Sequence, residues 1–162
     1  MRHWMLALAL GGAVLGGTAP AGAQALAVEA RLDAGVPVGD SDDFYDNGVG
    51  FGVRASVAVA PTFAVYGGYS RFEFDREAVL GEGEDEFDSF ELGGRVDLAG
   101  GSGGPYFMLG ALFQEDEETG IEAGIGADHA VSWDLSVTPE VRYRQTAWVD
   151  YLTLGMGVRF RF

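Results

Sequence analysis

The 162-residue chain contains no cysteine, no lysine and only five prolines. Without cysteine it forms no disulfide and no thiolate metal site, so an exported protein of this size must gain its stability elsewhere. All ten basic residues are arginines, and they face 25 acids, which gives a formal net charge of -15. That balance argues against a nucleic-acid-binding surface, which needs positive charge. No stretch after residue 17 is apolar for 18 residues, so we expect no transmembrane helix there.

The first 23 residues have the composition of a secretory signal peptide. Arg2 and His3 give a basic start, and the apolar stretch MLALALGGAVLGG follows at 5–17. Ala21 and Ala23 take the small-residue positions of a cleavage site, so we expect cleavage after Ala23 and one domain over residues 24–162. The alternative is an uncleaved membrane anchor, which needs about 20 apolar residues, and this glycine-rich stretch is shorter.

The segment LTLGMGVRFRF at 152–162 alternates with period two, which predicts a β-strand. One face is wholly apolar, whereas the other carries Thr153, two glycines, Arg159 and Arg161. Similar alternation recurs along the chain. It predicts eight strands, at 25–36, 48–60, 62–74, 89–98, 106–114, 121–131, 135–145 and 152–162.

The strand at 62–74 has two competing phases. Phe63, Val65 and Tyr69 share one face, whereas Phe72 and Phe74 fall on the other. A bulge near residue 70 would reconcile the two sets, and so would an aromatic pair that rises above the sheet. The sequence alone does not distinguish the two.

The connections between the predicted strands alternate in kind. Those at 60–62, 99–104 and 132–134 are short and contain proline, glycine or aspartate, whereas those at 39–48, 76–87 and 115–120 are longer and acidic, with 146–150 on the same side. Short turns at one end and longer loops at the other are typical of a bacterial transmembrane barrel, whose short turns are periplasmic. We therefore predict an all-β, eight-stranded, antiparallel, up-and-down transmembrane β-barrel with its apolar faces toward lipid.

A soluble β-sandwich also has alternating strands, with the apolar faces packed inward. Two features favour the barrel: the polar faces carry glycine and arginine but no lysine, and aromatic residues gather near the strand ends, as in interfacial girdles. Pro139 fits poorly, because it removes a ladder donor and a closed barrel has no edge for it. The expected girdle members are Phe44, Tyr45, Phe72, Phe74, Phe87, Phe113, Trp148 and Tyr151 toward the loops, and Phe63, Tyr106, Trp133 and Phe162 toward the turns.

Seven arginines and seven acids fall on the polar faces, while the other 18 acids lie in loops, turns and strand ends with only Arg71 and Arg76. The interior of an eight-stranded barrel is just wide enough for side chains to fill it, so charges there must pair. We predict a structural charge network that plugs the lumen; a narrow ion path is the alternative. Its members are Glu29, Arg31, Asp33, Arg54, Glu91, Arg95, Asp97, Glu122, Asp128, Glu140, Arg142, Arg144, Arg159 and Arg161.

The signal sequence, the eight alternating strands, the segment GIGADHAVSWDLSVTPEVRYR at 124–144 and the closing strand together resemble a known group. The chain resembles the small eight-stranded outer-membrane β-barrel family, which includes OmpX-like and OmpA-transmembrane-domain-like barrels and opacity-type surface proteins. The resemblance implies a place in the cell outer membrane. It also implies that Val158, Phe160 and Phe162, which share one face, form the signal read by the outer-membrane assembly machinery. The loops here are shorter and more acidic than in many adhesive members.

No residue set predicts catalysis, a cofactor or a metal site. His129 is the only histidine of the mature chain, with Ser132 and Asp134 or Glu140 near in sequence, but it lies beside a short turn, far from the outer leaflet. The acidic segment from Asp40 lacks the EF-hand spacing. Loosely bound divalent cations between the acidic loops and lipopolysaccharide phosphates are the only cations expected.

We therefore predict a non-enzymatic outer-membrane protein with a structural or surface-exposed role, such as a surface antigen. Outer-membrane lipid, lipopolysaccharide and the assembly machinery are its expected partners, and nucleic acid is not. The first alternative is a narrow channel for small solutes, and the second is a lipid A-modifying enzyme.

Overall fold

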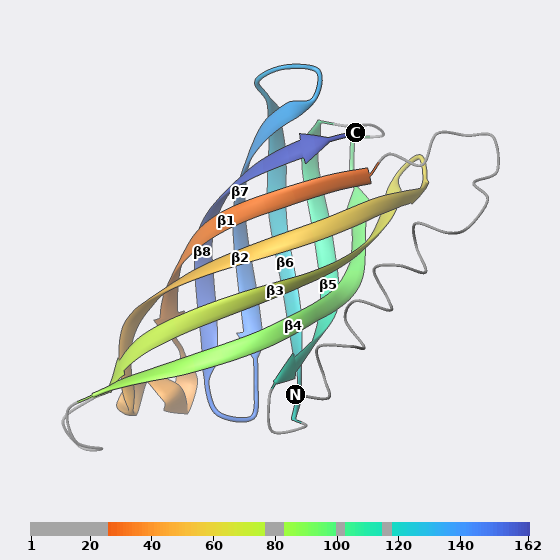
Figure 1. The fold of residues 1–162 in the computed structure, drawn as a ribbon. Coiled ribbons are helices and arrows are strands. Elements are labelled where there is room, and N and C mark those ends of the chain that lie inside the picture. Colours follow the sequence, from red (N-terminus) through yellow and green to blue (C-terminus); the bar gives the residue numbers. More distant parts are fainter. Residues whose placement is uncertain (1–25, 77–82, 100–102, 115–117) are drawn as a thin grey trace, which may run out of the picture.

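A computed structural model describes residues 26–76, 83–99, 103–114 and 118–162, so the expected signal peptide at 1–23 lies outside the described residues. Eight antiparallel strands pair in chain order, and β1 pairs with β8 to close a barrel (Figure 1). A short 3-10 helix, η1, spans Gly39–Asp43. Among the described residues, no helix is long and apolar enough to cross a membrane. The strands are β1 Leu26–Pro37, β2 Tyr45–Ala60, β3 Phe63–Arg76, β4 Glu84–Asp97, β5 Gly104–Gln114, β6 Thr119–Ala130, β7 Leu135–Gln145 and β8 Asp150–Arg161.

The predicted eight-stranded, up-and-down barrel is confirmed, with strands longer than the alternation showed. β2 begins at Tyr45 and β4 at Glu84, each within a segment predicted as loop. The β3–β4 ladder runs without a break from Phe63↔Val96 to Asp75↔Glu84. Acidic residues that were predicted to lie in loops therefore continue the strands, because the hydrogen-bond ladder tolerates any side chain that points into water.

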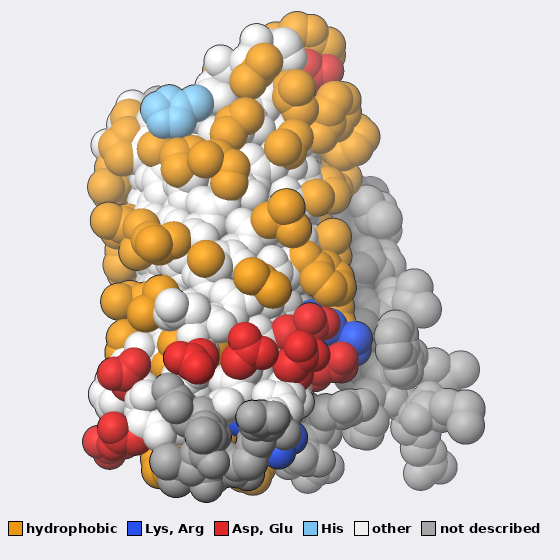
Figure 2. Space-filling model, turned by 90° about the vertical axis from the view of Figure 1, so that its left-hand side faces the viewer, with side chains coloured by type: hydrophobic (Ala, Val, Ile, Leu, Met, Phe, Trp, Pro, Cys, Tyr) orange, Lys and Arg blue, Asp and Glu red, His pale blue; other side chains and the backbone are white. Residues whose placement is uncertain are grey.

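The wall of the barrel has the opposite polarity to a soluble protein. Leu32 on the outer face is 71% exposed, whereas Arg142 and Arg144 on the inner face are fully buried. Hydrophobic side chains are spread over the outer surface, and a band of Asp and Glu side chains crosses it toward the loop end (Figure 2). Alternation with period two places these two chemistries on opposite sides of a single sheet.

The structure resolves the phase of β3. No bulge occurs near Ser70, because the pairing of β3 with β4 is continuous through that residue. Phe72 and Phe74 do not rise above the sheet either; both point into the barrel and are fully buried. The inward glycines of β1 and β2 make the room, since a Cβ at Gly50 would lie 2.6 Å from the Phe72 ring.

Inward glycines also give the interior arginines their space. A Cβ at Gly124 would lie 2.5 Å from Arg142 Cγ and 2.8 Å from the Val141 carbonyl oxygen, whereas the nearest atom to one at outward-facing Gly67 is 3.6 Å away. We expect Gly124→Ala to lower the free energy of unfolding by about 1–3 kcal/mol through overpacking. Gly67→Ala is the matched control and should change it by less than about 0.5 kcal/mol. Urea unfolding in detergent micelles measures both, and equal losses would contradict the close packing.

Pro139 interrupts the wall without shifting its register. β6 and β7 pair at Gly126↔Glu140 and again at His129↔Val137, and the two intervening residue pairs are missing from the ladder. Pro139 still pairs with Met156 on the β8 side. Pro139 therefore fits a closed barrel without an edge, because a local gap in one ladder accommodates the missing N–H.

Replacing Pro139 with valine should repair this gap. The new N–H can donate to β6, and a hydrogen bond of this kind contributes about 0.5–1.5 kcal/mol to stability. We expect Pro139→Val to raise the urea midpoint of the folded barrel in detergent. Val137→Thr on the same outward face adds no backbone donor and serves as the control. A lower midpoint for Pro139→Val would mean that the gap is already satisfied by another group.

Candidate functional site

All fourteen charged residues expected in the lumen lie on the inner face of the barrel. Twelve are buried, whereas Asp97 and Arg161 are half-buried. Their contacts divide them into two groups, with Glu29 between the groups. We define the central network as Arg31, Asp33, Arg54, Glu91, Glu122, Glu140, Arg142 and Arg144, and the turn-end network as Arg95, Asp97, Asp128, Arg159 and Arg161.

Arg142 is the centre of the central network. Its guanidinium lies 2.8 Å from Asp33 and 2.8 Å from Glu140, on strands β1 and β7. It also lies 3.3 Å from Glu122 and 3.6 Å from Glu91. One planar cation thus contacts four buried carboxylates, an arrangement that suits arginine because its donors fan out in one plane.

The other central arginines join strands from opposite parts of the chain. Arg54 donates two hydrogen bonds to Glu140, at 3.0 and 3.3 Å, across 86 residues of sequence. Arg144 lies 3.0 Å from Glu122 and also contacts Glu91, as does Arg31. Four arginines therefore face four carboxylates, and the group is neutral when all are ionised.

The turn-end network centres on Asp128. Its carboxylate accepts hydrogen bonds from Arg95 at 2.8 Å and Arg159 at 3.4 Å, and Arg161 lies 3.8 Å away. Arg95 also pairs with Asp97 at 2.6 Å. Three arginines face two carboxylates here, so this group carries one positive charge.

Glu29 lies between the two groups. Its backbone is paired with Arg54 on one side and with Arg159 on the other. Within the described part of the chain it is the one member of the fourteen with no ion pair inside 4.0 Å. Its influence on both groups is therefore through space rather than through direct contact.

Two tyrosines belong to the interior, and the sequence analysis missed both. Tyr66 donates to Glu122 at 2.8 Å, and the Arg54 guanidinium lies 4.7 Å from its ring centroid. Tyr106 was expected in the turn-side girdle, which is wrong: it is buried, it donates to Glu140 at 2.7 Å, and Arg95 lies over its ring at 3.6 Å. The inward glycines were the one feature of the sequence that could have predicted these rings. They mark positions where the interior needs space for a ring, but they do not show which ring occupies that space.

An aromatic cluster lies at the loop end of the interior. We define it as Phe72, Phe74, Val149 and Tyr151, with Tyr45 and Phe87 packed against it. Tyr151 lies 5.1 Å from each of the two phenylalanine rings. The expected girdle positions of Phe72, Phe74 and Tyr151 are therefore wrong. The girdle residues that are exposed are Phe44, Phe113 and Trp148 toward the loops and Phe63, Trp133 and Phe162 toward the turns.

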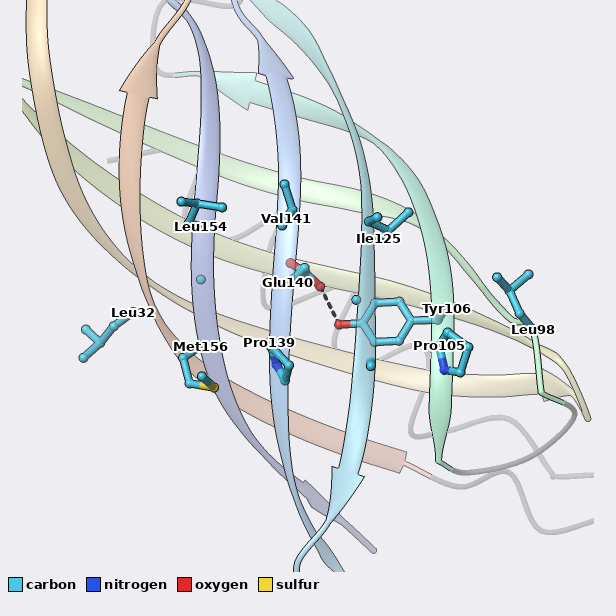
Figure 3. A pocket seen from close by; sticks show the side chains of 13 residues that line it. Leu32, Leu98, Pro105, Tyr106, Ile125, Pro139, Glu140, Val141, Leu154 and Met156 are labelled. Atoms are coloured by element: carbon cyan, nitrogen blue, oxygen red, sulfur yellow. Dashed lines mark hydrogen bonds between the residues drawn. The ribbon is translucent and has the colours of Figure 1, made fainter.

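The outer wall carries an apolar groove of about 670 Å³ over strands β5 to β8 (Figure 3). Leu154, Val141 and Ile125 border one side of it, and Met156 and Pro139 border the other. Tyr106 and Glu140 reach its floor, but their polar atoms bond to each other. The groove therefore offers hydrocarbon contacts, and its two polar side chains are bonded to each other.

Arg71 lies in β3, within the strand predicted at 62–74, and its side chain is on the outer wall near the loop end. It pairs with Asp88 through two hydrogen bonds of 2.7 and 2.8 Å, and Glu86 lies 3.4 Å away. Tyr69 donates to the same Asp88 carboxylate at 2.8 Å. The outward faces of β3 and β4 thus carry more acidic residues than Arg71 alone can neutralise.

The expected assembly residues lie on the lipid-facing side of the closing strand. Val158, Phe160 and Phe162 are all exposed there. The two phenylalanine rings meet edge to face at 4.9 Å, and the backbone N–H of Phe162 donates to Leu26 at 2.8 Å. Phe162 therefore completes the seam between the last strand and the first.

The residues considered for catalysis do not form a site. His129 is exposed on the outer face beside the β6–β7 turn, where Ser132 bonds to Asp134 instead. In the described ranges no hydrogen bond or ion pair joins His129 to either residue, and no group of three or more metal-ligating side chains is arranged to hold an ion.

Sequence comparison matches no protein-family profile and no curated protein. Solved structures do match. A de novo designed transmembrane β-barrel is 20% identical with a TM-score of 0.62, and the alignment covers 87% of this chain and 98% of the designed one. The N-terminal barrel domain of Pseudomonas aeruginosa OprF is 13% identical with a TM-score of 0.63, over 86% and 98% of the two chains. Ail, the attachment invasion locus protein of Yersinia pestis, is 16% identical with a TM-score of 0.61, over 86% and 99%.

The fold is that of the small eight-stranded outer-membrane barrels. At these identities the likeness establishes the architecture, so the location and role of this outer-membrane-type barrel rest on its own residues. Its interior arginine–carboxylate network and its aromatic cluster are the features from which a role can be argued.

Proposed function

We propose that the protein is an integral, non-enzymatic barrel of a bacterial outer membrane, with a structural or surface-exposed role and a lumen closed by its own side chains. The observation that carries the proposal is the inverted polarity of the wall, with twelve charged residues buried inside and large apolar residues exposed outside. Only a hydrocarbon solvent favours such an outer face. The exposed seam residues Val158, Phe160 and Phe162 support recognition by the outer-membrane assembly machinery.

The acidic loop end is proposed to face the cell exterior. Outward acids of β3 and β4, including Glu73, Glu86 and Asp88, would stand beside the phosphates of lipopolysaccharide. Loosely bound divalent cations would bridge the two anionic layers there. A structure of Ail includes the heparin analogue sucrose octasulfate; the net charge of -15 on this chain disfavours a polyanionic ligand of that kind.

Single cysteines test this orientation, because the natural chain has none. We expect Ser41→Cys and Glu84→Cys to react on intact cells with a membrane-impermeant maleimide. Ser132→Cys, in the exposed β6–β7 turn at the other end, should react only after the outer membrane is permeabilised. Labelling of Ser132→Cys alone on intact cells would reverse the orientation.

The closed lumen is tested by planar-bilayer recording of the purified barrel. We propose that the central network and the aromatic cluster fill the interior, and we therefore expect no stable conductance steps. Steady steps would favour the small-solute channel instead. For the enzyme alternative, lipid A mass spectra should be the same with the wild-type protein and with His129→Ala; a modification that depends on His129 would refute the non-enzymatic role.

A further inference from the structure

The two ends of the barrel interior differ in how much water they meet. At the loop end, Phe72 and Phe74 are 0% exposed and Tyr151 is 1% exposed. At the turn end, the side chains of Asp97 and Arg161 are 20% and 15% exposed. The charged residues of the central network lie between these two zones, and its members Arg142 and Arg144 are fully buried.

The aromatic cluster lies directly over the central network. Arg144 donates to Ser70 at 2.9 Å and to Tyr151 at 3.4 Å, and its guanidinium carbon is 5.3 Å from the Phe72 ring centroid. Phe72 and Phe74 stack with centroids 6.0 Å apart. The rings of Phe72 and Tyr151 therefore lie between the loop end and the Arg144 guanidinium.

The barrel wall is shaped to hold the rings in place. A Cβ at Gly35 would lie 2.8 Å from Phe74 Cζ, and one at Gly48 would lie 2.6 Å from Phe74 Cδ1. The segment above is tied down as well, because Val38 donates to the Asp150 carbonyl and the Asp150 N–H donates to Ser41, both at 2.9 Å. Rings packed this closely leave no gap in which water could be stably hydrogen-bonded.

We propose that the aromatic cluster is a hydrophobic seal that separates the charged interior from water at the loop end, so that water reaches the lumen only from the turn end. Apolar constrictions stop ions and water because a narrow apolar passage is dry. The seal extends the proposal of a closed lumen by naming the residues that close it. It rests on the proposed function only for the side of the membrane that the loop end faces. It assigns the barrier to Phe72 and Phe74 rather than to the arginines below them.

Ser70 reports on the seal because it lies just inside it and is fully buried. A Ser70→Cys variant is treated with a small cationic methanethiosulfonate in detergent micelles, with Asp42→Cys at an exposed position of η1 as the exposed reference. We expect Ser70→Cys to react about 100-fold more slowly than Asp42→Cys, since modification must await a local opening. Adding Phe72→Ala and Phe74→Ala should raise its rate by about 100-fold for the same reason.

The matched control adds Phe90→Ala and Phe113→Ala, a cross-strand aromatic pair that is exposed on the outer wall, and it should leave the Ser70→Cys rate unchanged. A shift between boiled and unboiled samples on a gel verifies that each variant is folded. If the variant without Phe72 and Phe74 does not fold, the Ser70→Cys rate measured with both phenylalanines intact still tests the proposal. A rate within about tenfold of the exposed reference would overturn it. No acceleration in a folded Phe72→Ala, Phe74→Ala variant would overturn it too. Both readouts are independent of membrane topology, so failure of the seal is distinguishable from failure of the proposed function.

Discussion

Arg142→Ala should lower the free energy of unfolding of the barrel by about 3–5 kcal/mol, the usual cost of removing one partner from a buried ion pair. The substitution removes the cation from four carboxylates at once, with Asp33 and Glu140 each 2.8 Å from it. The carboxylates stay buried, and the remaining arginines cannot cover all of them. Because domain stabilities are about 5–15 kcal/mol, the loss is a large share of the total. Urea unfolding in detergent micelles, followed by tryptophan fluorescence, measures it.

Two further arginines calibrate this result. Arg71→Ala removes an outward ion pair that is in contact with solvent, and such pairs contribute little to stability. Arg159 is buried, but Asp128, its one carboxylate partner in the described part of the chain, keeps Arg95 at 2.8 Å. We expect the losses to rank Arg142, then Arg159, then Arg71. Equal and negligible losses at all three positions would mean that the interior is hydrated.

Phe162→Asp should give a chain that is exported but does not assemble into the outer membrane. Phe162 is 71% exposed on the lipid-facing side, meets the Phe160 ring edge to face, and donates its backbone N–H to Leu26. A carboxylate at that position would place a charge at the lipid interface and remove the aromatic group proposed as the assembly signal. Immunoblots of periplasmic and outer-membrane fractions measure the outcome, and we expect the variant in the periplasm or degraded.

Trp133→Asp is the matched control for assembly. Trp133 is a second exposed aromatic residue at the turn end, 87% exposed, but it lies in the β6–β7 turn rather than in the closing seam. It should still reach the outer membrane in folded form. A normal, heat-modifiable barrel from Phe162→Asp would show that the terminal aromatic group is not required.

Period-two alternation was enough to predict the barrel because the strands form a single closed sheet, in which every second residue of a strand faces lipid. It failed where both phases are apolar. In β3 the aromatic residues at 72 and 74 belong to the interior, and they are buried by inward glycines on neighbouring strands rather than by anything in β3 itself. A single strand read in isolation contains no information about the volume that its neighbours leave open.

The interior charges could be assigned to the inner face, but their pairing could not. Arg54 reaches Glu140 across 86 residues, and Arg144 reaches Ser70 across 74. Such contacts depend on how the barrel closes and on side-chain length, which together determine which side chains pair in the lumen. The tyrosines Tyr66 and Tyr106 were missed for the same reason, because their ring positions are set by Arg54 and Arg95 from other strands.

Gel migration of the protein from an outer-membrane fraction, boiled and unboiled, tests the central claim most directly. A closed eight-stranded barrel in lipid keeps its hydrogen-bond ladder in mild detergent and migrates faster than its boiled, unfolded form. We predict that shift, with the protein absent from the periplasmic extract. Recovery of the protein in the periplasmic extract, with the same migration before and after boiling, would contradict a transmembrane barrel.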